Sequence, residues 1–251
     1  MNNKLTDRGY WQNYYNITYS KKEQIETICG VYDDLWDTSI RHKDNGNQEK
    51  IIEVGAFPGR YISYIAKKYG LIPTALDYNK NIKLIKNSFN AMRVKEYSLI
   101  KEDFLKLRTN KKYRYVYSIG FIEHFIDFRK IMNNHLKLLD DKGRLLIMIP
   151  NKRGLRRLYG YLCDYENLKK HNLKCMNKNT FDSFAKENNL KIILNEYIGG
   201  FQYSVHQKIN LPQKFLYIIT RFFALIFDDY IQKYPHWLYS ASIVAIFEKK
   251  D

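Results

Sequence analysis

The chain has 251 residues, a formal net charge of +16 at pH 7 and 45% hydrophobic residues. This balance is typical of a globular protein and excludes a disordered or fibrous chain. No apolar run reaches the about twenty residues of a membrane-spanning helix, and the polar amino terminus has no signal-peptide core. Its 3 cysteines form no CxxC pair and fit free thiols, so we expect a cytoplasmic protein.

Residues 1–45 are predicted to form a helical cover. Tyr10, Trp11, Tyr14 and Tyr15 fall at i and i+4 spacing, which places them on one aromatic stripe. This stripe would either close over a ligand or dock the amino-terminal helix on the core. Both interpretations put aromatic side chains against the rest of the molecule.

Short apolar strands and amphipathic helices alternate over residues 46–150, after a turn signal at 44–47. The predicted strands are 51–55, 72–77, 97–100, 113–119 and 145–149; the predicted helices are 60–69, 79–92 and a segment that ends before a turn at 140–143. This alternation indicates a mostly parallel sheet with helices on both faces. Ligands of such sheets bind beyond the carboxyl ends of the strands.

Residues 151–251 break this rhythm but continue the same domain. The predicted elements are an irregular basic stretch at 151–176, a helix at 180–189, a strand at 190–197, a helical insertion at 200–238 and a last strand at 240–247. Within the insertion, residues 215–227 are apolar almost all round. We predict a helix buried against the core as a lid; contact with a partner or a membrane surface is the alternative.

The loop at 53–59, which reads EVGAFPG, follows the first predicted strand. Gly55 allows a sharp turn and Gly59 allows a ligand to approach the next helix. The loop matches neither GxGxxG nor a P-loop, so nothing here indicates a bound dinucleotide or triphosphate. A dehydrogenase is therefore the least favoured function.

Carboxylates follow the next two predicted strands. Asp77 stands where an acidic side chain can accept both hydroxyls of a ribose. Asp103 and Phe104 follow the third strand, where a carboxylate could take an adenine amino group while the ring packs on the base. A turn or cap role is the alternative for each carboxylate, and their shared position at strand ends favours a ligand site.

Glu53-x-Gly55-x-x-x-Gly59, Asp77, Asp103 and the segment 118–125 (SIGFIEHF) together resemble motifs I to IV of class I S-adenosylmethionine-dependent methyltransferases. The SxGxxEHF form is similar to that of the small-molecule methyltransferases. Further similarities, to a bacterial subgroup linked to surface-polysaccharide biosynthesis, lie at Tyr10-Trp11, Pro150-Asn151, His171-Asn172 and Met176. The resemblance implies a Rossmann-like seven-stranded sheet whose last strand is antiparallel.

The resemblance also implies S-adenosylmethionine as cofactor. The cofactor-binding residues that it implies are Glu53, Gly55, Ala56, Gly59, Asp77, Tyr78, Asp103, Phe104, Ile119 and Gly120, with Tyr15 of the aromatic stripe closing over them.

Two histidines are candidates for the base that a hydroxyl acceptor needs, because histidine titrates near neutral pH. His124 follows the fourth strand, and His171 lies in the basic stretch that would border the acceptor. Packing or an exposed loop position is the alternative for each. Metal-dependent relatives carry a Glu where this chain has Gly120, which leaves Glu123 and His124. Two donors are too few unless others come from distant segments, so no metal is expected.

One basic cluster directly follows the fifth strand, at Lys152, Arg153, Arg156 and Arg157. Arginine can bind phosphate or carboxylate through two parallel hydrogen bonds, so the cluster predicts an acidic acceptor, with Trp11 also at the substrate.

The hypothesis is O-methylation of a small acidic molecule, such as a sugar nucleotide or a phosphate or phosphoramidate group of a capsule precursor. The alternatives are an RNA methyltransferase or nucleic-acid binder that uses the net positive charge, and a cofactor-binding scaffold that docks a partner through residues 215–227.

Overall fold

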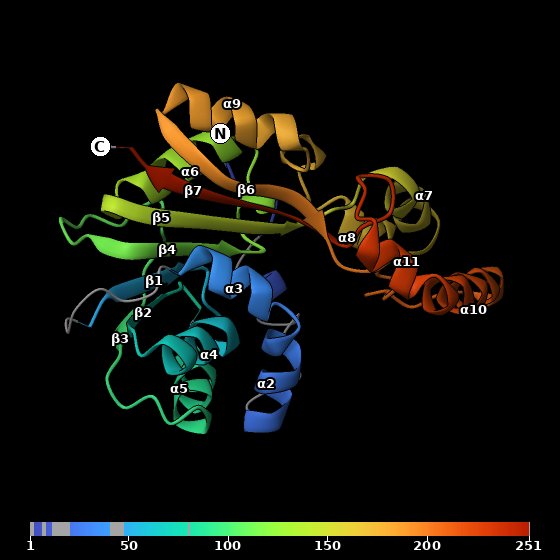
Figure 1. The fold of residues 1–251 in the computed structure, drawn as a ribbon. Coiled ribbons are helices and arrows are strands. Elements are labelled where there is room, and N and C mark those ends of the chain that lie inside the picture. The colour runs from blue at the N-terminus through green and yellow to red at the C-terminus, as the bar shows by residue number, and fades with distance from the viewer. Residues whose placement is uncertain (1–2, 7–8, 12–20, 41–47, 80, 251) are drawn as a thin grey trace.

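The computed structural model describes residues 3–6, 9–11, 21–40, 48–79 and 81–250. Its strands form one seven-stranded sheet in the order β3-β2-β1-β4-β5-β7-β6 (Figure 1), and β7 runs antiparallel to both of its neighbours. The strands are β1 (Lys50–Val54), β2 (Ile72–Leu76), β3 (Ser98–Ile100), β4 (Tyr113–Ile119), β5 (Leu139–Pro150), β6 (Leu190–Ile198) and β7 (Ser242–Lys249). The predicted Rossmann-like sheet with an antiparallel last strand is confirmed.

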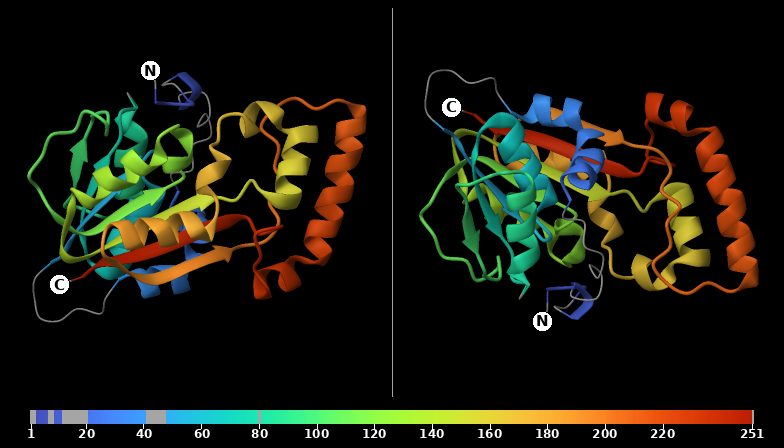
Figure 2. Two further views of the ribbon diagram at one scale, coloured as in Figure 1. Left: turned by 90° about the horizontal axis from the view of Figure 1, so that it is seen from above. Right: turned by 90° about the horizontal axis from the view of Figure 1, so that it is seen from below.

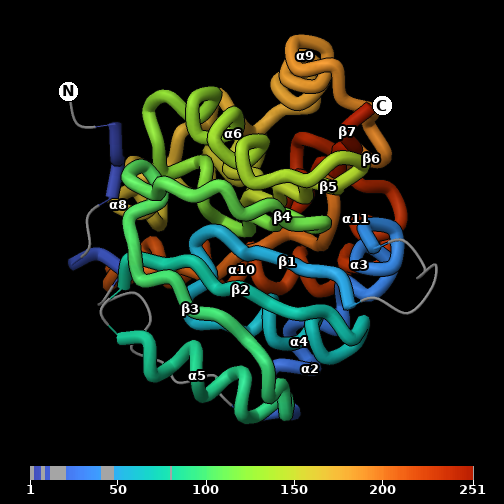
Figure 3. The backbone as a smooth tube through the Cα atoms, turned by 90° about the vertical axis from the view of Figure 1, so that its left-hand side faces the viewer, coloured from blue at the N-terminus to red at the C-terminus, as the bar shows by residue number. Residues whose placement is uncertain are grey.

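Helices cover both faces of this sheet (Figure 3). One face carries α3 (Asp33–Ser39), α4 (Arg60–Tyr69) and α5 (Ile82–Ala91), with α2 (Lys22–Gly30) packed on α4; the other carries α6 (Phe128–Leu136) and α9 (Lys178–Glu187). Successive residues of a strand point to opposite faces, so Tyr115 packs into the α3–α5 side of the core and Val116 into the α6–α9 side.

The predicted turn at 140–143 lies inside a strand instead of ending a helix. α6 already ends at Leu136, and Leu139 pairs with Tyr113 at the start of β5. The register then shifts before Tyr115, and Lys142 adopts a positive φ of 57°. The turn residues therefore form an irregularity within β5, because strand pairing with β4 continues on both sides of them.

A helical lobe lies beyond the carboxyl ends of the parallel strands (Figures 1 and 2). It contains α7 (Gly154–Cys163), α8 (Tyr165–Leu168), α10 (Leu211–Ile226) and α11 (Asp228–Lys233), while the short 3-10 helices η1 (Ile122–His124) and η2 (Leu173–Cys175) lie nearer the sheet. The prediction of irregular chain at 151–176 is wrong. In α7, Arg156, Tyr159 and Cys163 share one buried face at helical spacing, a pattern that the many basic residues obscure.

The predicted burial of residues 215–227 as a lid on the core is also wrong. These residues form most of α10, which lies at the outer side of the lobe (Figure 2). Ala224 is the buried residue of this helix, whereas Phe215 is 68% exposed and Phe222 is 61% exposed. No helix within the described part of the chain is long and apolar enough to cross a bilayer.

Candidate functional site

The loop between β1 and α4 brings the backbone close to its neighbours in a way that only glycine permits. Gly55 has a φ of 75°, and a Cβ atom there would lie 2.5 Å from Cδ2 of Phe121. Gly59 has a φ of 94°, and a Cβ atom there would lie 3.0 Å from Cα of Ile85. The two glycines therefore hold open a cradle at the carboxyl end of β1.

Glu53 connects the start of this loop to the helix that follows it. Its side chain is buried, and Oε2 accepts a hydrogen bond from the backbone N–H of Ile62 at 3.0 Å. This N–H belongs to the first turn of α4, whose N-cap residue Gly59 offers no side chain. Burial raises the pKa of Glu53 to about 8, against the hydrogen bond and the charge of Arg60.

Asp77 stands just past the end of β2, next to the glycine cradle. Its Oδ2 accepts from the backbone N–H of Phe57 at 3.1 Å, and its Oδ1 accepts from that of Asn79 at 2.7 Å. The carboxylate thus joins the ends of β1 and β2. It lines a pocket together with Gly55 and Tyr78.

Asp103 lies past the end of β3 and forms an ion pair that the sequence did not predict. Its Oδ2 is 2.5 Å from Nζ of Lys4, which also lies 4.8 Å from the centre of the Tyr78 ring. Phe104 is buried beside it. The ammonium of Lys4 is therefore paired with the carboxylate that was expected to accept a hydrogen bond from an adenine amino group.

An amino-terminal strap, defined as residues 3–6, holds Lys4 in this position. Lys4 pairs antiparallel with Phe125 in an isolated β-bridge. The N–H of Leu5 donates to the carbonyl of His124 at 2.8 Å. The strap thus runs along the segment that carries the SIGFIEHF motif.

Three pockets follow one another along these strand ends, and Trp11 and Gly55 line all three. The largest has a volume of about 400 Å³, and the others have volumes of about 40 Å³ and about 30 Å³. The predicted cofactor residues that line one or more of them are Glu53, Gly55, Ala56, Asp77, Tyr78, Asp103, Phe104, Ile119 and Gly120. Gly59 lies against α5, and Tyr15 is outside the described residues.

His124 and His171 meet in the largest of these three pockets, with ring centres 4.7 Å apart. Nδ1 of His124 lies 2.9 Å from the carbonyl of Lys170, and Nδ1 of His171 lies 2.7 Å from the carbonyl of Asn167. Burial lowers the pKa of His124 to about 4 and that of His171 well below its usual range. Both rings are therefore neutral at pH 7.

Glu123 completes this cluster. Its Oε1 is 3.5 Å from Nε2 of His124, and its side chain is only 1% exposed. Burial raises the pKa of Glu123 to about 8. Trp11 covers the cluster from the amino-terminal side, with its ring edge-on to His124 at 4.7 Å between centres.

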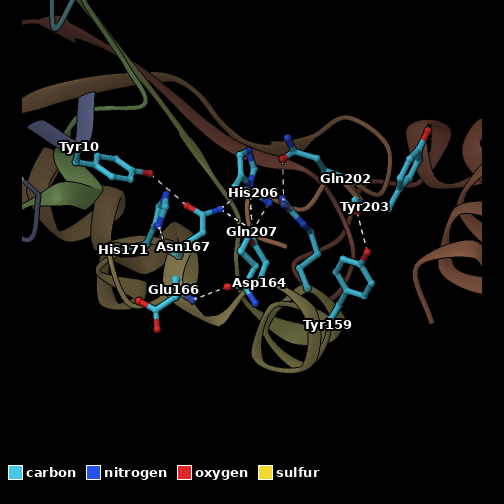
Figure 4. A network of polar contacts seen from close by, with 11 residues as sticks. Tyr10, Tyr159, Asp164, Glu166, Asn167, His171, Gln202, Tyr203, His206 and Gln207 are labelled. Carbon is cyan, nitrogen blue, oxygen red and sulfur yellow. Dashed lines mark hydrogen bonds and ion pairs between the residues drawn. The ribbon is translucent and has the colours of Figure 1, made fainter. Parts of the chain in front are cut away.

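A polar network in the helical lobe fixes the backbone around His171 (Figure 4). Asp164 accepts from the side chain of Asn167 at 2.7 Å and lies 3.0 Å from Nδ1 of His206. Burial alone would raise the pKa of Asp164, yet these hydrogen bonds hold it below its usual value. On the other side of His171, the backbone N–H of Asn172 donates a hydrogen bond to the carbonyl of Glu123 at 2.7 Å.

Comparison with known protein families identifies the chain. The family model described as "Methyltransferase domain" matches residues 21–195. The chain belongs to this methyltransferase family. No curated protein matches it significantly.

Solved structures share the fold of this methyltransferase at low identity. Coclaurine N-methyltransferase, solved with N-methylheliamine and SAH, has a TM-score of 0.56 at 11% identity, over 90% of this chain and 73% of that chain. An O-methyltransferase family protein from Burkholderia thailandensis has a TM-score of 0.56 at 10% identity, over 96% and 63%. The N-methyltransferase NodS from Bradyrhizobium japonicum, in complex with S-adenosyl-l-homocysteine, has a TM-score of 0.50 at 12% identity, over 99% and 95%.

The methyltransferase does not gather its basic cluster into one anion clamp. Arg156 is buried, and its guanidinium donates to the carbonyls of Asn151 and Ala241 and to Gln202. Arg153 lies over the ring of Trp237, with 5.7 Å from its guanidinium carbon to the ring centre, and Arg157 is exposed.

Lys152 is the member of the cluster that adjoins the site. Its charge acts on Glu123, His124 and His171, and burial lowers its own pKa to about 8. The four cations separate because α7 begins within the cluster and turns successive side chains to different sides.

Among the residues that line the largest of these three pockets, sequence reasoning missed Arg60, Tyr32 and Tyr61 in particular. Arg60 is the first residue of α4, directly after Gly59. A cation next to a loop glycine is a signal that could have been found. Tyr32 precedes α3, and no sequence pattern connects it with the loop.

Proposed function

We propose that this protein is an S-adenosylmethionine-dependent O-methyltransferase for a small acidic acceptor. The observation that carries the proposal is the run of connected pockets at the strand ends. It joins the glycine cradle and the carboxylates Asp77 and Asp103 to a cluster of buried proton acceptors. The cradle fits a ligand that approaches the backbone closely, because a side chain at Gly55 would fill it.

S-adenosylmethionine, when bound, supplies a methyl group on a positively charged sulfur. The residues of the chain must then hold the acceptor oxygen in line with that methyl group and accept its proton. His124 and His171 are neutral and have an unprotonated ring nitrogen. Burial raises the pKa of Glu123 to about 8, so this carboxyl group is protonated at pH 7, and the proton of the acceptor hydroxyl passes to the free ring nitrogen of His124 or His171.

The acidic nature of the acceptor is supported by Arg60 at the pocket wall and by Lys152 beside Glu123. Partial burial strengthens the attraction between such cations and an anion. A phosphorylated sugar or a sugar nucleotide of a surface-polysaccharide precursor has both the hydroxyl and the negative charge that this site would take.

Cofactor binding is tested by calorimetry with S-adenosylhomocysteine. Asp77→Ala should abolish measurable binding, because the ligand loses a half-buried carboxylate as hydrogen-bond acceptor. Asp77→Asn keeps an oxygen for the N–H of Asn79 and thereby separates loss of ribose contacts from collapse of the loop. Undiminished affinity in both variants would remove the cofactor assignment.

The acceptor is tested by a screen of phosphorylated metabolites and sugar nucleotides with labelled methyl donor. On any hit, Lys152→Met should raise KM for the acceptor about tenfold or more, as expected when a charged contact of about 1.5 kcal/mol or more is lost. Arg157→Gln is the matched control, since this exposed cation of the same basic cluster should leave KM unchanged. Equal KM values in Lys152→Met and the wild type would argue against an anionic acceptor at this position.

The exposed side of α10 supports a peripheral contact with an anionic membrane surface. Leu211, Phe215, Ile218 and Phe222 form an exposed apolar stripe, and the charged residues of this helix, Lys214 and Arg221, are both basic. The chain should co-sediment with vesicles that contain phosphatidylglycerol, and Phe215→Glu combined with Phe222→Glu should abolish this. Binding to neutral vesicles alone, or none, would contradict the proposal.

A further inference from the structure

Glu123, His124 and His171 place three metal-ligating side chains at one point of the largest pocket at the strand ends. One ligand atom from each lies within 4.8 Å of the other two. Glu123 and His124 come from η1, whereas His171 comes from the segment before η2. The expectation of too few donors for a metal counted Glu123 and His124 only, and the fold supplies the third.

The backbone sets the orientation of both imidazoles. A carbonyl can only accept, so Nδ1 of His124 donates its proton to Lys170 and Nδ1 of His171 donates its proton to Asn167. In a neutral ring this leaves the lone pair on Nε2. Hydrogen bonds from the remote ring nitrogen to a carbonyl are also what fixes histidine ligands in metalloproteins.

The cluster contains acceptors without a matching donor. Oε2 of Glu123 is buried and has no hydrogen-bond partner among the described residues. Nε2 of His124 lies 3.5 Å from Oε1 of Glu123, and His171 has a ring nitrogen within 4.8 Å of both neighbouring ligand atoms. The charged form of a carboxyl group buried without a partner is costly, which agrees with the raised pKa of Glu123, and a cation bound between these groups would remove this cost. The arrangement is therefore that of a cation site.

We propose that Glu123, His124 and His171 bind a divalent transition-metal ion of the Zn²⁺ class. Two imidazoles and one carboxylate suit such ions, whereas Mg²⁺ and Ca²⁺ prefer oxygen ligands. Ligand atoms about 2.05 Å from a tetrahedral Zn²⁺ lie about 3.3 Å apart, so the side chains need to close by about 1.5 Å at most. Three protein ligands leave one position open toward the pocket.

The use of this open position rests on the proposed function, but metal binding itself does not. In the methyltransferase reaction the ion would hold the acceptor oxygen and lower the pKa of its hydroxyl, in the place where the free imidazoles would otherwise accept the proton. If the chain does not bind S-adenosylhomocysteine, the proposed function fails but the metal site does not. If the chain binds no metal ion, the metal site fails but the proposed function does not.

The test is calorimetric titration of the full chain, purified in the presence of a chelator and then dialysed, with Zn²⁺. A parallel titration with Co²⁺ follows its visible absorption bands, which report tetrahedral nitrogen and oxygen ligands. We expect one ion per chain. His171→Ala and Glu123→Gln should each weaken Zn²⁺ binding more than about 100-fold, beyond the usual cost of losing an outer partner of a ligand.

His236→Asn is the matched control, because His236 lies in the loop before β7 and its ring nitrogen accepts from Leu238, a role that the Asn oxygen can take. This variant should keep one ion per chain. Binding of S-adenosylhomocysteine and the thermal unfolding midpoint show that each variant is folded. No binding of Zn²⁺ or Co²⁺ to the wild type, or binding that His171→Ala leaves unchanged, overturns the proposal.

Lys152→Met separates the proposal from its main rival, in which the ammonium of Lys152 is the cation that balances Glu123. Removing a nearby positive charge should leave Zn²⁺ affinity unchanged or raise it. Zn²⁺ binding that is absent in the wild type and present only in Lys152→Met would show that the lysine fills this role and would overturn the metal site.

Discussion

Gly55 illustrates how a single residue sets the shape of the glycine cradle after β1. Its positive φ and the nearness of Phe121 leave no room for a side chain. Gly55→Ala should lower the free energy of unfolding by about 1–3 kcal/mol and weaken S-adenosylhomocysteine binding at least tenfold. Gly160→Ala is the control. Gly160 lies within α7, and a Cβ atom there would meet the side chain of Leu168 at an ordinary contact distance of 3.7 Å. The free energy of unfolding should therefore rise by about 0.5–1 kcal/mol. Equal effects of the two changes, measured by urea unfolding, would contradict this account.

His135 carries a pH dependence of stability. It is fully buried in α6, and burial lowers its pKa to about 4 from an ordinary value near 6.5. Between these values the unfolded chain binds a proton that the folded chain does not, so stability is lost as pH falls. The loss between pH 7 and pH 5 should be about 2 kcal/mol. His135→Phe should reduce the difference between urea unfolding at the two pH values by this amount, and an unchanged difference would refute the assignment.

At the scale of elements, α10 shows that an apolar helix need not be a buried one. Phe222 lies in its exposed stripe, while Phe89 of α5 is fully buried in the core. Phe222→Ala should change the free energy of unfolding by no more than about 0.5 kcal/mol. Phe89→Ala should cost about 3–5 kcal/mol, because it leaves a cavity. A cost above about 2 kcal/mol for Phe222→Ala would mean that the stripe is covered in solution.

At the scale of the whole molecule, the amino-terminal strap links the start of the chain to the end of β3. Lys4 neutralises Asp103 where a bound adenine would need the same carboxylate. Half-exposed pairs contribute up to about 1 kcal/mol, so Lys4→Met should bind S-adenosylhomocysteine about two- to fivefold more tightly in calorimetry. Lys22→Met is the control, since Lys22 pairs with Glu26 on the surface of α2. Weaker binding by Lys4→Met would show that the lysine assists the ligand.

The distribution of the net charge of +16 also belongs to this scale. The basic cluster after β5 does not form a joint binding surface, because Arg156 is buried among carbonyls and Arg157 points to solvent. Within that cluster Lys152 acts electrostatically on both His124 and His171, Arg156 acts on His171, and Arg60 of α4 lines the same pocket as the histidines. The positive charge near the candidate site is therefore a minor part of the total.

The order of strands and helices up to β5 could be predicted because each element depends on neighbouring residues. The helix at 60–69 and the strand at 113–119 match the structure in their bounds. Gly55, Asp77 and Asp103 could be named as candidate site residues for the same reason. The positive φ of Gly55 and the positions of the two aspartates after strands are local properties of the chain. Their meeting along one edge follows from the parallel sheet.

What the sequence alone determined was the fold family and those candidate site residues that follow the strands of the sheet. Only the tertiary structure decided that His171 joins Glu123 and His124, that Lys4 covers Asp103 and that Phe222 faces solvent. These outcomes depend on contacts between segments far apart in the chain. Such contacts are selected by packing and by the pairing of buried polar groups, which no periodicity within one segment encodes.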